Sequence, residues 1–112
     1  MLDSQALAQL RGAAGRATGL MKALANEDRL LLLCQLVNGE LCVSDFTERT
    51  GISQPTLSQQ LGVLRNEGLV NTRRDGKRIY YSLANPDVLR VLQLLHELYC
   101  PAPATATREP KP

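Results

Sequence analysis

Several residue types that mark common protein classes are scarce in this 112-residue chain. It contains no Trp, one Phe, three Tyr and one His, although 44% of its residues are hydrophobic. We therefore expect a globular protein with an aliphatic core, dominated by leucine. The longest apolar run, residues 30–34, is far shorter than the ~18 residues that a membrane helix needs. Residues 1–20 lack the continuous apolar region of a signal peptide, so we expect a cytosolic protein.

The cysteines do not have the spacing of a common metal or enzyme motif. There are three, Cys34, Cys42 and Cys100, with no Cys-x-x-Cys pair, and His96 is the single histidine. This spacing excludes a zinc finger. The chain also lacks a glycine-rich phosphate loop and a Cys/His/Asp set typical of thiol enzymes. We therefore expect no enzyme activity, no cofactor and no closed metal site.

The net charge is only +2, with an isoelectric point near 8.6, but the basic residues are unevenly distributed. Between residues 65 and 78 the chain has five cations and two acids. The cations are Arg65, Arg73, Arg74, Lys77 and Arg78, and the acids are Glu67 and Asp75. A local basic cluster of this kind is typical of a surface that contacts phosphates.

Hydrophobic periodicity and end signals predict five helices and one hairpin. The helices are expected at 4–24, 27–37, 43–50, 54–66 and 86–99, with residues 40–42 as a short segment between the second and third. Strands are expected at 69–73 and 78–83, around the turn residues Asp75 and Gly76. Asn26 is a suitable N-cap for the second helix, and Gly51 is a suitable stop for the third.

Two of these helices form a helix-turn-helix pattern. The predicted helices 43–50 and 54–66 are joined by a three-residue turn that contains Gly51, which is the signature of that motif. Leu57, Leu61 and Leu64 recur at the spacing of a core-facing stripe. Ile52 is expected to fill the angle between the two helices. The fold class predicted is therefore mainly α with a small β-hairpin: a winged helix-turn-helix.

The exposed side of the second of these helices carries uncharged hydrogen-bonding groups. We expect four of them, Gln54, Thr56, Ser58 and Gln59, to meet base edges in the major groove. The basic hairpin that follows has the position of a wing. We expect Arg73, Arg74, Lys77 and Arg78, together with Arg65, to contact phosphates. The alternative is a solvated polar helix face, but the basic hairpin directly after the motif favours DNA binding.

The first and last predicted helices carry apolar stripes outside the motif. Proteins that bind duplex DNA with one recognition helix per chain usually dimerise, so that the two helices reach two half-sites. We therefore expect a homodimer formed through these two helices, the alternative being that they close the core of a monomer. Residues 1–100 are expected to form one DNA-binding and dimerisation domain. Residues 101–112 contain four prolines and are expected to be a disordered tail.

Four segments resemble the ArsR/SmtB family of winged-helix repressors, over about residues 20–100. They are Ala23–Leu30 before and into the second helix, Glu40–Asp45 at the third, Ser53–Leu61 at the recognition helix and Gly76–Leu83 in the wing. The resemblance implies a homodimeric repressor that binds double-stranded operator DNA. It also implies that an inducer controls release.

Departures from the family pattern bear on the inducer. Thiolate metal sensors of the family carry Cys-x-Cys at the third helix, where this chain has Cys42 and Ser44. Zinc sensors carry paired ligands along the last helix, where Asp87 and His96 alone are available. By contrast, Cys34 and Cys100 are similar to the cysteine pair of the persulfide-sensing branch. That similarity implies a disulfide or polysulfide bridge between the two thiols, with reactive sulfur species as the inducer and release of DNA as the result.

Alternatives remain for each thiol. Cys34, on an apolar helix, is otherwise an inert core cysteine. Cys42 is a candidate N-cap for the third helix, with Asp45 completing a capping box. Otherwise it is a thiol for As(III) or another soft metal, in a metal- or arsenite-responsive repressor that uses Cys42 with other thiols. A thiol enzyme and a bare dimeric interaction module are weaker alternatives.

Overall fold

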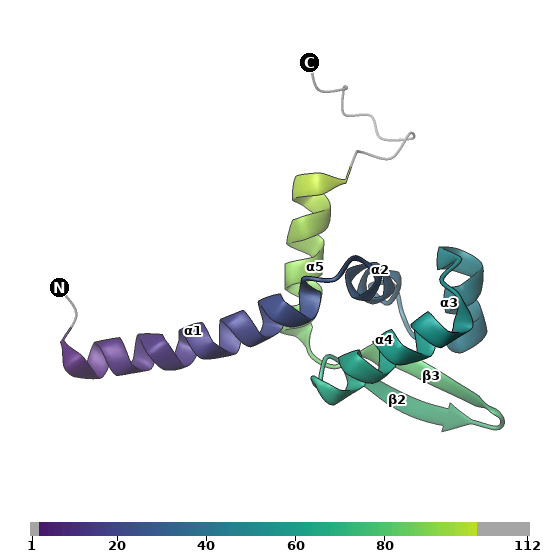
Figure 1. Ribbon diagram of the computed structural model, residues 1–112, viewed down its shortest axis with the longest axis horizontal. Helices are drawn as coiled ribbons and strands as arrows, with labels where there is room; N and C mark the ends of the chain where they lie inside the picture. The colour runs from purple at the N-terminus through teal and green to yellow at the C-terminus, as the bar shows by residue number, and fades with distance from the viewer. Residues whose placement is uncertain (1–2, 101–112) are drawn as a thin grey trace, which may run out of the picture.

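The computed structural model describes residues 3–100 and contains five helices and a small sheet (Figure 1). In chain order the elements are α1 (Ser4–Leu24), α2 (Glu27–Gln35), β1 (Leu41–Cys42), α3 (Val43–Thr50), α4 (Gln54–Asn66), β2 (Val70–Asp75), β3 (Arg78–Leu83) and α5 (Pro86–Tyr99). The winged helix-turn-helix predicted from the sequence is confirmed. The expected disordered tail, 101–112, lies outside the described residues.

Capping residues fix the ends of several helices, as predicted for Asn26 and Gly51. Asn26 Oδ1 accepts a hydrogen bond from the backbone N–H of Arg29 at 2.9 Å, and so caps α2. Asn85 Oδ1 does the same for Val88 N–H at 3.0 Å at the start of α5. Gly51 ends α3 in the left-handed region, with φ 71°, where a residue with a Cβ is strained. These caps fix where α2 and α5 begin and where α3 ends.

Three boundaries differ from the predicted ones. Helix α2 ends at Gln35 rather than at 37, because Leu36 N–H bonds to the carbonyl of Leu33, three residues back, and the chain turns. Strand β2 runs from 70 to 75 rather than from 69 to 73, because its pairing with β3 continues to the turn. Residues 41–42 form an unpredicted strand, β1, whose two residues are too few to show a period. The sheet order is β1-β3-β2.

The core is built mainly from leucines and contains one buried aromatic residue. Phe46 is completely buried, and its ring meets that of Tyr81 edge-on at 6.1 Å between centroids. The expected leucine-dominated aliphatic core is confirmed except at Phe46, the single Phe of the chain, which lies where α3 meets the sheet. The remaining buried side chains come from α2, α4, β1, β2, α5 and the end of α1.

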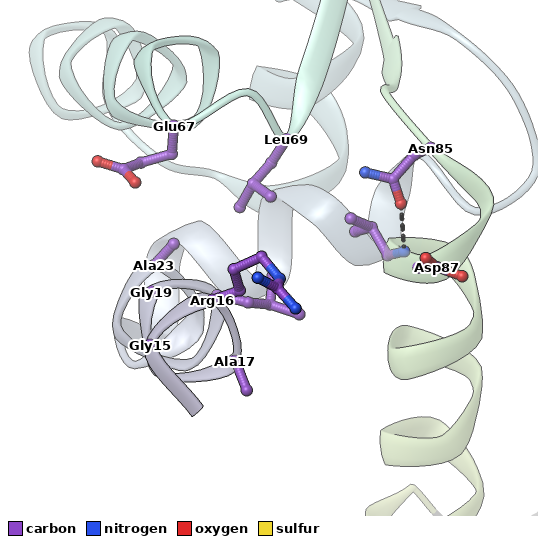
Figure 2. Close-up of a pocket in the computed structure, with 11 residues that line it drawn as sticks. Gly15, Arg16, Ala17, Gly19, Ala23, Glu67, Leu69, Asn85 and Asp87 are labelled. Carbon is purple, nitrogen blue, oxygen red and sulfur yellow. Dashed lines mark hydrogen bonds between the residues drawn. The ribbon is translucent and has the colours of Figure 1, made fainter. Parts of the chain in front are cut away.

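Helices α1 and α5 project away from this core in different directions (Figure 1). Ala23 is the one buried residue of α1, although that helix has 21 residues. The Cα radius of gyration is 17.1 Å, whereas a compact chain of this size has about 13 Å. Where the two helices diverge, a groove of about 630 Å³ opens beside Gly15, Gly19 and Ala23 of α1 (Figure 2). The projecting helices thus leave much of their surface without cover from their own chain.

No helix within residues 3–100 is both long enough and apolar enough to cross a membrane.

Candidate nucleic-acid interface and thiol pair

Helix α4 presents a polar face to the outside because its apolar stripe is held in the core. Leu57, Leu61 and Leu64 are at most 2% exposed, so the opposite face of the helix is turned toward solvent. Gln54, Ser58 and Gln59 lie on that exposed side, and Thr56 is half-buried. Gln54 Nε2 donates to Ser58 Oγ at 3.2 Å. The structure thus brings together, on one helix, the four residues expected to meet bases.

Arg29 is a positioning residue that the sequence reasoning missed. Its Nε donates to the carbonyl of Ala23 at 2.7 Å, its Nη1 to Gln60 Oε1 of α4 at 3.0 Å, and its Nη2 to the carbonyl of Lys22 at 3.3 Å. One side chain of α2 therefore ties the end of α1 to α4. The partners are up to 31 residues away in the chain, so no local pattern reveals them.

The wing is a two-stranded ribbon whose cations are exposed. Strand β2 pairs with β3 in a register that sets Arg74 opposite Ile79 and Asp75 opposite Arg78. Gly76, with φ 64°, makes the tight turn between them. Arg74, Lys77 and Arg78 are all exposed near this turn, and Arg65 is exposed at the last turn of α4. The cations of the wing therefore form a group that solvent, or a phosphate, can reach.

Arg73 differs from these cations because it is already engaged. Its Nε donates to both carboxylate oxygens of Glu40, at 3.0 and 2.9 Å, and its Nη2 donates to Glu40 Oε1. Its guanidinium carbon lies 4.8 Å from the centre of the Tyr80 ring. The hydrogen bond lowers the pKa of Glu40 and raises the pKa of Arg73, so both groups keep their charge.

Cys42 lies at the N-cap of α3, as predicted. Its backbone N–H donates to Asp45 Oδ2 at 3.0 Å, and its thiol lies 3.3 Å from the same oxygen and 3.3 Å from Ser44 Oγ. The bond from the Cys42 backbone, followed by that from the thiol, lowers the pKa of Asp45. The expected Asp45 half of a capping box is therefore present, and Cys42 is 4% exposed.

Cys34 lies near the end of α2, and Cys100 directly follows the end of α5. Cys34 is half-buried and packs against the core, whereas Cys100 is exposed. Burial raises the pKa of the Cys34 thiol, and the charge of a Cys100 thiolate raises that pKa further. Both cysteines are free thiols in this structure. Although the two residues are 66 positions apart in the chain, a charge at Cys100 therefore acts on the pKa of Cys34.

The comparisons with known proteins agree with this geometry. A family model described as bacterial regulatory protein, arsR family, matches residues 26–72. The transcriptional activator HlyU of Vibrio cholerae is 43% identical over 96 residues, which are 86% of this chain and 89% of HlyU. The biofilm growth-associated repressor of Agrobacterium fabrum is 47% identical over 81 residues, which are 72% of this chain and 69% of the repressor. The chain belongs to the ArsR family of bacterial regulatory proteins.

Solved structures support the same assignment. The structure of reduced HlyU from Vibrio cholerae matches with a TM-score of 0.78 and 42% identity, over 82% of this chain and 97% of that one. The homodimeric winged helix-turn-helix DNA-binding domain of Mb0332 from Mycobacterium bovis matches with a TM-score of 0.68 and 35% identity, over 87% and 86%. This ArsR-family protein is therefore a transcriptional regulator rather than an enzyme.

The metal sites known in some ArsR-family proteins have no counterpart among the residues described. Within residues 3–100, no three His, Cys, Asp or Glu side chains are grouped to hold a metal ion. A closed site generally needs about four ligands. Asp87 pairs instead with Arg90, at 3.8 Å.

Proposed function

We propose that this ArsR-family regulator is a homodimeric repressor that binds operator DNA while its thiols are reduced. It releases the DNA when Cys34 and Cys100 are bridged by a persulfide, a polysulfide or another oxidant. The observation that carries the proposal is the pair of free thiols near the ends of α2 and α5, one half-buried and one exposed, and the effect of charge at Cys100 on the pKa of Cys34 supports it. Helix α2 packs against α3 and α4, whereas α5 carries an exposed apolar surface, so a bridge would join the DNA-reading part to that surface.

The DNA contacts follow from the exposed groups of α4 and the wing. In this proposal Gln54, Thr56, Ser58 and Gln59 read base edges, which Gln and the hydroxyl residues can do by hydrogen bonding. Arg65, Arg74, Lys77 and Arg78 neutralise phosphates on either side, which sets register and makes binding depend on salt. Arg73 is withheld from this set while Glu40 holds it. Bound protein then represses by blocking the same DNA to other proteins.

The dimer is proposed to form through α1 and α5. Leu7, Leu10 and Met21 of α1 are 41–57% exposed, and Leu94 and Leu98 of α5 are 53% and 62% exposed. An apolar surface spread over two projecting helices marks a site of association. The groove beside Gly15 and Gly19 extends this surface to the base of α5 (Figure 2). The similar Mb0332 domain is described as homodimeric, which supports a dimer without specifying its interface.

The dimer is tested by replacing Leu94 with Glu. We expect the dimer to weaken at least about a hundredfold, because each interface would bury two unpaired carboxylates. Sedimentation equilibrium measures the change. Gln93→Glu adds the same charge at an exposed neighbouring position that is not apolar, and it should leave the dimer unchanged. Equal weakening by both variants would contradict an interface on the Leu94 side of α5.

The proposed bridging has two steps that balance in atoms and electrons. The exposed Cys100 thiolate attacks a sulfane sulfur of a polysulfide, which gives a Cys100 persulfide and a shortened polysulfide. The Cys34 thiolate then attacks the Cys100 sulfur, and hydrosulfide leaves. The two cysteines lose two electrons in total, and the transferred sulfur is reduced to sulfide. Cys100 reacts first because it is exposed, whereas Cys34 is half-buried.

This order predicts how bridging depends on pH. The thiolate is the nucleophile, and burial together with the charge of Cys100 raises the pKa of Cys34 above the ordinary thiol value. Closing by Cys34 onto a mixed disulfide formed beforehand at Cys100, whose leaving thiolate needs no proton, should therefore accelerate about tenfold per pH unit through the neutral range, and level off only above the ordinary thiol pKa. Rapid quenching followed by mass spectrometry, in a Cys42→Ser background, measures the rate. A rate independent of pH between 6 and 8 would contradict Cys34 as the closing thiol.

The proposed function as a whole is tested by titrating duplex DNA at fixed salt with the reduced, disulfide-treated and polysulfide-treated protein. We expect the reduced protein to bind in a salt-dependent way. Each oxidant should weaken binding about tenfold to a hundredfold, the range of typical allosteric coupling. Binding that is equally strong in all three states rejects the thiol switch. Absence of salt-sensitive binding in the reduced state rejects DNA binding itself.

A further inference from the structure

We propose that Glu40 withholds Arg73 from DNA, so that the wing offers one phosphate-binding cation fewer than its sequence contains. The ion pair between these residues acts as an internal competitor for phosphate, and it limits the affinity of the protein for DNA of any sequence. The proposal rests on the proposed DNA binding, and it assigns Glu40, a residue outside the recognition helix and the wing, a part in setting its strength.

The pair lies across the sheet rather than along one edge of it. Glu40 directly precedes β1 and Arg73 is on β2, and the strand order β1-β3-β2 sets β3 between them. Cys42, Tyr80 and Arg73 are register partners across the three strands, so their side chains share one face. The Arg73 side chain therefore folds over Tyr80 of the middle strand to reach Glu40, which explains the 4.8 Å between its guanidinium and that ring.

This conformation occupies the groups of Arg73 that bind phosphate. A guanidinium binds phosphate through pairs of N–H groups on one edge. In Arg73, Nε and Nη2 both donate to Glu40, and Nη1 lies 3.9 Å from Asp75 Oδ2. One face of the group lies against Tyr80. A phosphate therefore has to displace a carboxylate before it can bind Arg73, and the displaced Glu40 would then repel it.

Two other cations of the wing, Arg74 and Lys77, make no ion pair with a carboxylate among the described residues. Arg74 makes a long bond, 3.4 Å, to the carbonyl of Gly76 in its own turn. Lys77 is exposed at the turn itself. Arg73, whose guanidinium lies over the Tyr80 ring and bonds to Glu40, therefore differs from Arg74 and Lys77 near the tip. Since phosphate contacts add affinity for every sequence alike, a carboxylate that removes one of them lowers binding to non-specific DNA.

The experiment measures the affinity of the full chain for a random duplex of about 30 base pairs, long enough for two half-sites, at several salt concentrations. Glu40→Gln should release Arg73, tightening binding about threefold per wing and about tenfold per dimer. The salt dependence of log K should steepen by about 0.9 per wing. The double variant Glu40→Gln, Arg73→Gln should bind like the wild type, because a neutral pair replaces a neutral pair. Glu48→Gln, the matched control, removes an equal charge from exposed α3 and should change affinity less than twofold.

Each other outcome counts against the proposal. Equal gains from Glu40→Gln and Glu48→Gln would show an effect of net charge alone. Weaker binding by Glu40→Gln would show that Glu40 instead holds Arg73 ready for phosphate. A double variant weaker than the wild type would show that Arg73 already contacts DNA. Absence of binding by the wild type rejects the proposed function together with this proposal, whereas wild-type binding without the Glu40→Gln gain rejects this proposal alone.

Discussion

Replacing Arg74, Lys77 and Arg78 together by Gln is expected to weaken DNA binding about a thousandfold at 0.1 M salt, with little effect on folding. Each phosphate contact contributes about 0.9 to the slope of log K against log salt. Three contacts in each of two wings make about six, so the slope should become shallower by about five. The three side chains are exposed, and none is part of the core, so the melting temperature should change little.

A charge-preserving variant provides the control for this prediction. Exchanging the same three residues as Arg74→Lys, Lys77→Arg and Arg78→Lys keeps the number of cations, and should keep the salt slope. Fluorescence anisotropy with one duplex at four or more salt concentrations measures both variants. If the Gln variant retained the wild-type salt slope, the wing would not contact phosphates. The main argument that the exposed face of α4 binds DNA would then be lost.

The local rules of the sequence were sufficient for the helix-turn-helix. Asn26, Gly51 and Asn85 end or begin helices through bonds to residues at most four positions away, so their effect is visible in the sequence. The leucine stripe of α4 likewise predicted which face is buried, and therefore which face is exposed. These features depend on backbone geometry and on a period of 3.6 residues, both of which are local.

The features that were missed depend on distant partners. Arg73 was predicted as one cation among several, because Glu40 lies 33 residues earlier and reaches it only across the folded sheet. Strand β1 exists because Leu41 and Cys42 pair with Tyr81 and Tyr80, and not because two residues favour a strand. The bridge made by Arg29 between α1 and α4 has the same origin. Charge counts along the chain therefore do not show that Arg73 is paired with Glu40 in the folded protein.

Replacing Cys100 by Ser is expected to leave the DNA affinity of the reduced protein unchanged and to abolish release by polysulfide. Cys100 is exposed at the end of α5, so Ser should cost little stability there. In the wild type, a direct bond would close a loop of more than 60 residues. A loop of that length constrains the unfolded chain by roughly 4 kcal/mol in the loop-entropy model. This constraint acts on the unfolded chain, so release of DNA requires in addition that the bond fits the DNA-free arrangement of the dimer better than the DNA-bound one.

The control is Cys42→Ser. A hydroxyl can replace the Cys42 thiol in its bonds to Ser44 and Asp45, so α3 keeps its cap, and the Cys34–Cys100 pair is untouched. This variant should still be released by polysulfide, and mass spectrometry under non-reducing conditions should find Cys34 joined to Cys100. Cys34→Ser should behave like Cys100→Ser, because either thiol alone leaves a persulfide with nothing to close on. Normal release of the Cys100→Ser variant would mean that the regulator responds to polysulfide through another group. Cys42 would then be the first residue to test, because it borders a cavity of about 220 Å³ beside Lys77 and Arg78.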